Sequence, residues 1–132
     1  MNSFFLGCAA ALAFAGSAAA QDIMAVYDTR LDPHDLVNSN GQPLGSVCAA
    51  VQQDRANYHR FKKRGQVDDP DPIFANSNRT MRARIAGSCI IKPGHEHLHK
   101  AVFSGIGYGI IVRVEVLNDA GPLKVLVSER AG

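Results

Sequence analysis

The sequence predicts an α+β domain in which two helices pack on a small antiparallel sheet with a C-terminal β-hairpin and one disulfide. A helical period of apolar residues covers 44–61, strict alternation covers 108–117 and 123–128, and two cysteines remain after an apolar N-terminal segment. Helices followed by strands in one short chain are typical of an α+β architecture. Without its apolar N-terminal segment the chain spans residues 21–132, a length that suits one domain with one core.

Residues 1–20 predict a secretory signal peptide. The segment has no charged side chain, and alanines stand at the −3 and −1 positions of a cleavage site after Ala20. Its apolar stretch, residues 4–15, is shorter than the about 20 residues of a membrane-spanning helix, so we expect no transmembrane span in the mature form. We therefore expect residues 21–132 to form a single domain in the periplasm or outside the cell.

The cysteines fit such an oxidising compartment. Cys8 lies in the signal peptide and is removed with it, unless it serves as a lipoprotein acceptor, which is the alternative at this position. Cys48 and Cys89 remain, and two cysteines in an oxidising compartment most simply pair. Their bridge closes a loop of roughly 40 residues and contributes about 4 kcal/mol by the chain-entropy estimate.

The first elements follow from apolar spacing. Residues 23–27 predict a short strand, and the Pro, Gly, Asp and Asn residues of 28–45 predict an irregular connection. Residues 44–61 predict a helix that ends before Gly65, which we expect to act as its left-handed cap. The inward stripe consists of Leu44, Val47, Cys48, Val51, Arg55 through its stem, Tyr58 and Phe61. The expected outer face consists of Gln52, Gln53, Asp54, Asn57 and Arg60.

The later elements complete the fold class. Residues 68–72, with three aspartates and two prolines, predict a solvated acidic loop. Asn76 or Ser77 can begin a second helix that runs to about Ser88. Its inward residues are Met81, Ile85 and Cys89, and its outward residues are Arg79, Arg82 and Arg84. The alternation in 108–117 and 123–128 around the turn residues 118–122 predicts a β-hairpin.

Residues 93–99, Pro-Gly-His-Glu-His-Leu-His, form the one motif with chemical content. His95, Glu96 and His99 match His-Glu-x-x-His and so resemble the zincin metallopeptidase signature over these five residues. The resemblance implies two zinc-binding histidines one helical turn apart and a glutamate that activates the bound water. Glu115, the nearest downstream carboxylate that could complete the site, lies on an expected strand.

Two other interpretations of this segment stay open. If it is extended, His95, His97 and His99 project from one face and can bind zinc or copper without catalysis. The entry through Pro93-Gly94 fits such a looped path as well as a helix. The third interpretation is an exposed histidine-rich turn that holds no metal. The sequence therefore commits to no cofactor, with zinc and copper as the candidates.

Two basic clusters are candidates for binding. They consist of Arg60, Lys62, Lys63 and Arg64 after the first helix, and of Arg79, Arg82 and Arg84 on the second. If they share a face, they form a patch for an acidic protein, a lipid headgroup or a polyanionic glycan. The alternative is a solvated face that Asp68, Asp69 and Asp71 balance. The formal net charge of +2 is too small to predict a nucleic-acid partner.

These observations predict a small exported domain without catalytic activity that binds a protein or an envelope component. The alternative is a zinc- or copper-binding protein that uses His95, His97 and His99, with a small metallopeptidase as its extension.

Overall fold

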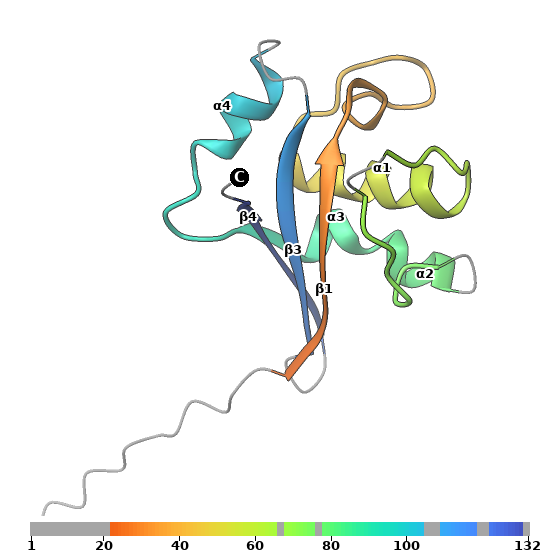
Figure 1. Cartoon of the computed structure of the whole chain (residues 1–132), viewed down its shortest axis with the longest axis vertical. Helices are drawn as coiled ribbons and strands as arrows, with labels where there is room; N and C mark the ends of the chain where they lie inside the picture. Colours follow the sequence, from red (N-terminus) through yellow and green to blue (C-terminus); the bar gives the residue numbers. More distant parts are fainter. Residues whose placement is uncertain (1–21, 66–67, 76–77, 105–108, 119–121, 131–132) are drawn as a thin grey trace, which may run out of the picture.

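The computed structural model describes residues 22–130 apart from 66–67, 76–77, 105–108 and 119–121 (Figure 1). The expected signal peptide with Cys8, the capping candidates Asn76 and Ser77, and Tyr108 all lie outside the described residues. Within the described ranges, no helix combines the length and the apolar character that crossing a bilayer requires.

A four-stranded sheet forms the centre of the fold, with the strand order β1-β3-β4-β2. The strands are β1 (Asp22–Leu31), β2 (Cys89–Ile91), β3 (Ile110–Asn118) and β4 (Leu123–Glu129). The β3–β4 pairing is antiparallel, which confirms the predicted hairpin, and β1 also pairs antiparallel with β3. The short strand β2 runs parallel to β4, so the sheet is mixed and the expected antiparallel sheet is wrong in this strand.

Strand β1 is longer than the predicted strand at residues 23–27, because its second half is polar but still buried. Asp28 and Thr29 are both buried in the strand, where the sequence pattern predicted a loop. The Asp28 carboxylate accepts a 2.9 Å hydrogen bond from Arg113 Nε, and the Thr29 hydroxyl donates to Asp54 at 2.8 Å. These distant partners offset the cost of burying polar groups, so the irregular connection begins only at Asp32.

Helix α1 (Val47–His59) confirms the first predicted helix. The Ser46 side chain caps it by accepting a 3.0 Å bond from the backbone N–H of Ala49. Val47 and Val51 are buried as predicted, but Asp54 and Asn57, which the pattern assigned to the solvent face, are buried too.

The end of α1 also differs from the prediction. Lys62, with a φ of 57°, adopts the left-handed conformation that we expected at Gly65. Phe61 lies beyond the helix and is 50% exposed, although the helical period placed it in the inward stripe. The chain therefore turns away from the core directly after the helix.

The second predicted helix is two short helices, α2 (Arg79–Arg82) and α3 (Ile85–Ser88). The Arg84 N–H donates to the Met81 carbonyl three residues back at 3.0 Å, which tightens the chain and ends α2. Ile85 is buried in the core as predicted.

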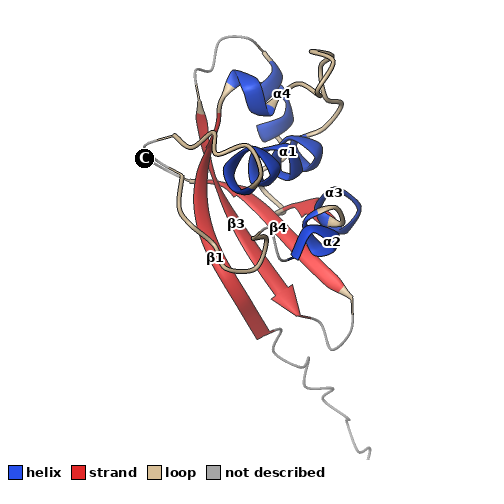
Figure 2. Cartoon of the chain, turned by 90° about the vertical axis from the view of Figure 1, so that its right-hand side faces the viewer, coloured by secondary structure: helices blue, strands red, loops and turns tan. Residues whose placement is uncertain are grey.

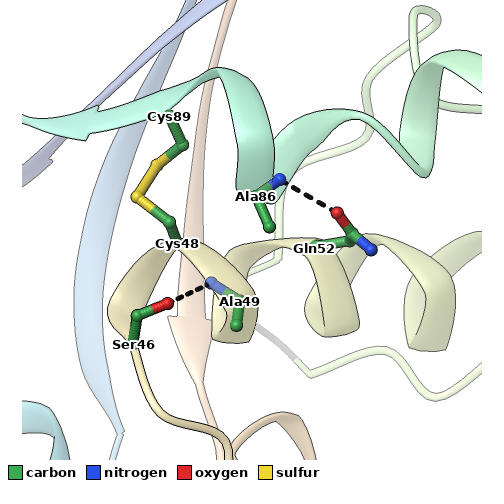
Figure 3. Close-up of a disulfide and its surroundings, with 6 residues drawn as sticks. All are labelled: Ser46, Cys48, Ala49, Gln52, Ala86 and Cys89. Atoms are coloured by element: carbon green, nitrogen blue, oxygen red, sulfur yellow. Dashed lines mark hydrogen bonds between the residues drawn. A yellow bond between two sulfur atoms is a disulfide. The ribbon is translucent and has the colours of Figure 1, made fainter.

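The predicted disulfide joins Cys48 in the first turn of α1 to Cys89 at the start of β2 (Figure 3). Their Cα atoms are 5.7 Å apart, which is ordinary for a disulfide. Beside the bridge, Gln52 Oε1 accepts a 2.9 Å bond from the Ala86 N–H (Figure 3). The bridge and this bond hold α3 and β2 against α1.

Helices α1, α2 and α3 lie on one side of the sheet (Figure 2). Helix α4 (Leu98–Phe103) buries Leu98 and Val102 in the same core. The short 3-10 helix η1 (Pro33–Asp35) connects β1 toward α1. This arrangement brings α2 beside the C-terminal half of α1, where the two basic clusters of the sequence meet.

Candidate functional site

The C-terminal half of α1 presents two neighbouring stripes of side chains. Residues four positions apart on a helix share a face, and adjacent stripes differ by one residue. The stripes are Gln52, Ala56 and the C-cap Arg60 on one side, and Gln53 and Asn57 on the other, with Phe61 following directly after the helix. Each stripe lines its own pocket, so two hollows flank the end of this helix.

The first stripe faces α2 across a pocket of about 150 Å³. Its lining residues are Gln52, Ala56, Arg60, Arg79, Arg82 and Ala83. Three of these six residues are arginines, and none is acidic. We call this hollow the basic pocket.

Arg82 is the buried member of the basic pocket. It is only 5% exposed, so the expectation that it points outward is wrong. Its Nη1 donates to the Phe74 carbonyl at 3.2 Å, which anchors the side chain against the core. Burial lowers the pKa of Arg82, and the charges of Arg79 and Arg60 lower it further, while Asp71 partly opposes them. The charges of Arg79 and Arg60 therefore repel that of Arg82.

In the part of the chain that the structure describes, no carboxylate forms an ion pair within 4.0 Å with the arginines of the basic pocket, Arg60, Arg79 and Arg82. An anionic group is therefore the natural complement of this pocket.

The loop at residues 68–72 was expected to balance these arginines, but its aspartates are engaged elsewhere. Asp68 accepts a 2.6 Å bond from the Gly65 N–H and a 3.1 Å bond from the Arg30 N–H. Asp69 accepts a 3.0 Å bond from the Asp28 N–H. Asp71 is buried, so the prediction of a solvated loop is wrong at this residue. The loop pins the edge of β1 and leaves the basic pocket positive.

The remaining basic residues do not join the pocket. Arg64 lies over the Tyr58 ring, 4.4 Å from its centroid, and its Nε donates to the Tyr58 carbonyl at 3.2 Å. Lys63 lines the neighbouring pocket, and Lys62 forms the left-handed turn. Arg84 is exposed between α2 and α3. The structure therefore brings together three of the seven basic residues that the sequence singled out.

A buried charge network around Arg55 ties α1 to β1 and to the loop at residues 68–72. The Arg55 side chain is fully buried, although we expected only its stem to point inward. Its Nε and Nη1 donate 2.7 Å bonds to Asp54 and Asp71. The guanidinium also lies 4.2 Å from the Tyr27 ring centroid and 4.5 Å from that of Tyr58. Sequence patterning missed this network because its members come from distant segments.

The pKa values of the two carboxyl groups in this network, Asp54 and Asp71, are shifted in opposite directions. Burial raises the pKa of Asp54 to about 7, against the opposing effects of Arg55 and Thr29. Burial also tends to raise the pKa of Asp71, but bonds from the Phe74 N–H, His59 and Arg55 outweigh it and lower that pKa. The network is closed to solvent and stabilises the fold, so we assign no ligand to it.

The histidine motif does not lie on one helix. Helix α4 begins at Leu98, so His95 and His99 are not placed one turn apart on a helix as the zincin resemblance implied. His97 Nε2 contacts the Glu129 carboxylate, and the His95 ring stacks on that of His97 at 6.1 Å. His99 packs on the Phe103 ring at 5.1 Å.

The partners of these residues bear on metal binding. His95 Nδ1 accepts a 3.1 Å bond from the Glu129 N–H. This bond uses the acceptor nitrogen of a neutral imidazole and ties the His95 ring to the end of β4. Glu96 accepts from the Gly94 N–H at 3.0 Å, and Glu115 lies 3.7 Å from Lys92 Nζ.

Another group of ligand types was not singled out from the sequence. Within the described residues, Asp32, His34 and Asp35 form the one group of three whose ligand atoms all lie within 4.8 Å of one another. Both Asp35 oxygens already accept bonds, from the Asp32 N–H at 2.9 Å and from Asn57 Nδ2 at 2.8 Å. These bonds close the turn of η1 and tie it to α1, so they give the group a structural role.

No protein-family model, curated protein or solved structure matches the chain.

Proposed function

We propose that the chain is an exported, non-catalytic binding domain that holds an anionic group of a protein or envelope component in the basic pocket. One observation carries the proposal: Arg60, Arg79 and Arg82 line a single hollow that contains no acidic residue. A carboxylate or phosphate there would relieve the repulsion between the guanidiniums and accept their N–H groups.

The chemistry of the pocket favours binding over catalysis. An arginine stays protonated at neutral pH and acts as neither an acid nor a base. Its planar N–H groups instead match the oxygens of a carboxylate or phosphate. The remaining lining residues, Gln52, Ala56 and Ala83, add an amide and two small apolar surfaces.

Export is the second part of the proposal. It rests on the signal-like pattern of residues 1–20 and agrees with the Cys48–Cys89 disulfide, which an oxidising compartment favours. Mass measurement of the protein recovered from the periplasm or the medium tests this part. A polypeptide that begins at Gln21 is expected, and an intact N-terminus would contradict cleavage.

Titration with inorganic phosphate, followed by NMR of the backbone amides, tests the pocket. We expect saturable shifts at α1 and α2 and a loss of affinity of about tenfold or more in Arg60→Gln/Arg79→Gln, because charge-assisted hydrogen bonds disappear. Arg84→Gln is the matched control, since Arg84 is exposed beside α2 but does not line the pocket. Equal phosphate affinity in the double variant and the wild type would contradict the proposal.

Metal binding at the histidine motif is the second candidate function. The contact between His97 and the Glu129 carboxylate favours it, because an imidazole and a carboxylate side by side are ligands for zinc. Equilibrium dialysis of the untagged protein against micromolar zinc and copper, beside His97→Ala, tests it. Stoichiometric metal that the variant loses supports this candidate, and no uptake by the wild type removes it.

A further inference from the structure

We propose that the anionic group held in the basic pocket belongs to an acidic saccharide, whose sugar ring lies against Phe61 in the neighbouring pocket. This inference rests on the proposed function and names its ligand class. The neighbouring pocket has a volume of about 300 Å³ and includes Phe61, Lys63, Gln53, Ser39 and His34 in its lining. We call it the Phe61 pocket.

The two pockets flank the end of α1, where Arg60 and Phe61 are adjacent. Arg60 lines the basic pocket and Phe61, the next residue, lines the Phe61 pocket. The Arg60 guanidinium carbon lies 5.0 Å from the centroid of the Phe61 ring. Arg60 therefore borders both hollows, and a ligand that packs on the Phe61 ring can carry an anionic substituent to the Arg60 guanidinium.

The lining of the Phe61 pocket suits a sugar ring. A pyranose has an apolar face of C–H groups and a rim of hydroxyls, so it requires a flat hydrophobic surface surrounded by hydrogen-bonding groups. Phe61 is 50% exposed and supplies that surface. Ser39 adds a hydroxyl to the lining, and Gln53 uses its Nε2 on Asn57 at 3.1 Å and keeps its carbonyl oxygen as an acceptor.

Other anionic partners fit this surface less well. A peptide that adds a strand needs a sheet edge, and the residues lining these pockets come from η1, the loop after it, and the region of α1 and α2. A lipid surface needs several apolar side chains beside the basic ones. Phe61 is the one large exposed hydrophobic residue among the linings, and the others of the described chain, Ile23, Met24, Val26 and Ile90, lie on β1 and β2.

Calorimetric titration of the exported, oxidised protein tests the inference with four probes: trigalacturonate, triglutamate, maltotriose and inorganic phosphate. Trigalacturonate is expected to bind at least about tenfold more tightly than maltotriose or phosphate, because only it contacts both pockets. Phe61→Ala should lower the trigalacturonate affinity about tenfold and leave the phosphate affinity within about twofold. Ile90→Ala, which removes a side chain of similar exposure on β2, is the matched control and should change neither.

The outcomes separate this inference from the proposal beneath it. In one outcome, Arg60→Gln/Arg79→Gln weakens phosphate binding, but trigalacturonate binds no more tightly than phosphate. That result contradicts the saccharide inference and supports the anion site. In another outcome, triglutamate binds as tightly as trigalacturonate, and Phe61→Ala binds both with the affinity of the wild type. That result also contradicts the saccharide inference. If none of these anions binds, the proposed function fails and this inference fails with it.

Discussion

Arg55 joins three parts of the fold through one side chain. From α1 it donates to Asp54 on the same helix, to Asp71 in the loop, and through Nη2 to the Thr29 hydroxyl on β1 at 3.2 Å. The flanking rings of Tyr27 and Tyr58 complete its surroundings. A buried charge with this many partners stabilises the fold only while every partner is present.

We expect Arg55→Met to destabilise the protein by about 3–5 kcal/mol, because it leaves two carboxylates buried without their counter-charge. Urea unfolding followed by circular dichroism measures the change. Arg84→Met, at an exposed arginine, is the control and should alter the stability by less than about 0.5 kcal/mol. A similar small effect for both variants would show that the network contributes little.

Lys62, unlike Arg55, affects stability through its backbone conformation rather than through its side chain. Its φ of 57° lies in the left-handed region, which costs a residue with a Cβ about 1 kcal/mol. We expect Lys62→Gly to stabilise the protein by about 0.5 kcal/mol, after subtracting the entropy that glycine adds to the unfolded chain. Lys63→Gly, one position later, should not stabilise it. Thermal unfolding compares the two variants, and a loss of stability in Lys62→Gly would contradict the argument.

At the scale of elements, local patterning worked where a buried face is apolar. The period of Val47 and Val51 predicted α1, and the alternation of buried valines predicted β3. It failed where the buried face is polar. Asp28 looked like a loop residue because its partner Arg113 is 85 positions away in the sequence, and no local window contains such a pair.

The disulfide is the element-scale contact whose removal is simplest to interpret. It ties the first turn of α1 to β2, and α3 ends directly before Cys89. We expect Cys48→Ala/Cys89→Ala to lose about 2–5 kcal/mol of unfolding free energy, chiefly because the unfolded chain regains the entropy of an open loop.

Denaturant unfolding of the oxidised, reduced and double-alanine proteins measures this contribution. The reduced wild type and the double variant should agree, since both lack the bridge. Equal stability of the oxidised and reduced proteins would mean that packing of α3 on α1 suffices without it.

At the scale of the whole molecule, sequence analysis identified the basic residues as candidates but did not predict which of them share a pocket. Arg60, Arg79 and Arg82 were already candidates, and only the packing of α2 against α1 selects them from the seven. The Phe61 pocket had no sequence signal, because Phe61 belongs to the helical period and yet lies past the end of α1. Sites made where two elements meet depend on tertiary contacts that spacing alone does not encode.

The pH dependence of stability also belongs to the whole molecule, and Asp54 gives it a distinctive sign. Burial raises the pKa of Asp54 to about 7. A carboxyl whose pKa is raised in the folded state stabilises the fold while it is protonated, and this contribution is lost as the pH rises from about 4 to 7. An asparagine side chain does not titrate in this range, so Asp54→Asn should gain at least about 1 kcal/mol relative to the wild type between pH 4 and pH 7.

Asp28→Asn is the matched control, because the pKa of Asp28 is shifted in the opposite direction to that of Asp54. The bond from Arg113 lowers the pKa of Asp28, and burial opposes it only in part. Its contribution is therefore present above about pH 4 and lost as the pH falls further, so the deficit of Asp28→Asn should shrink in acid. Urea unfolding from pH 3 to pH 8 measures both differences. A deficit of Asp54→Asn that also shrinks in acid would mean that Arg55 keeps Asp54 ionised, and the raised pKa of Asp54 would be wrong.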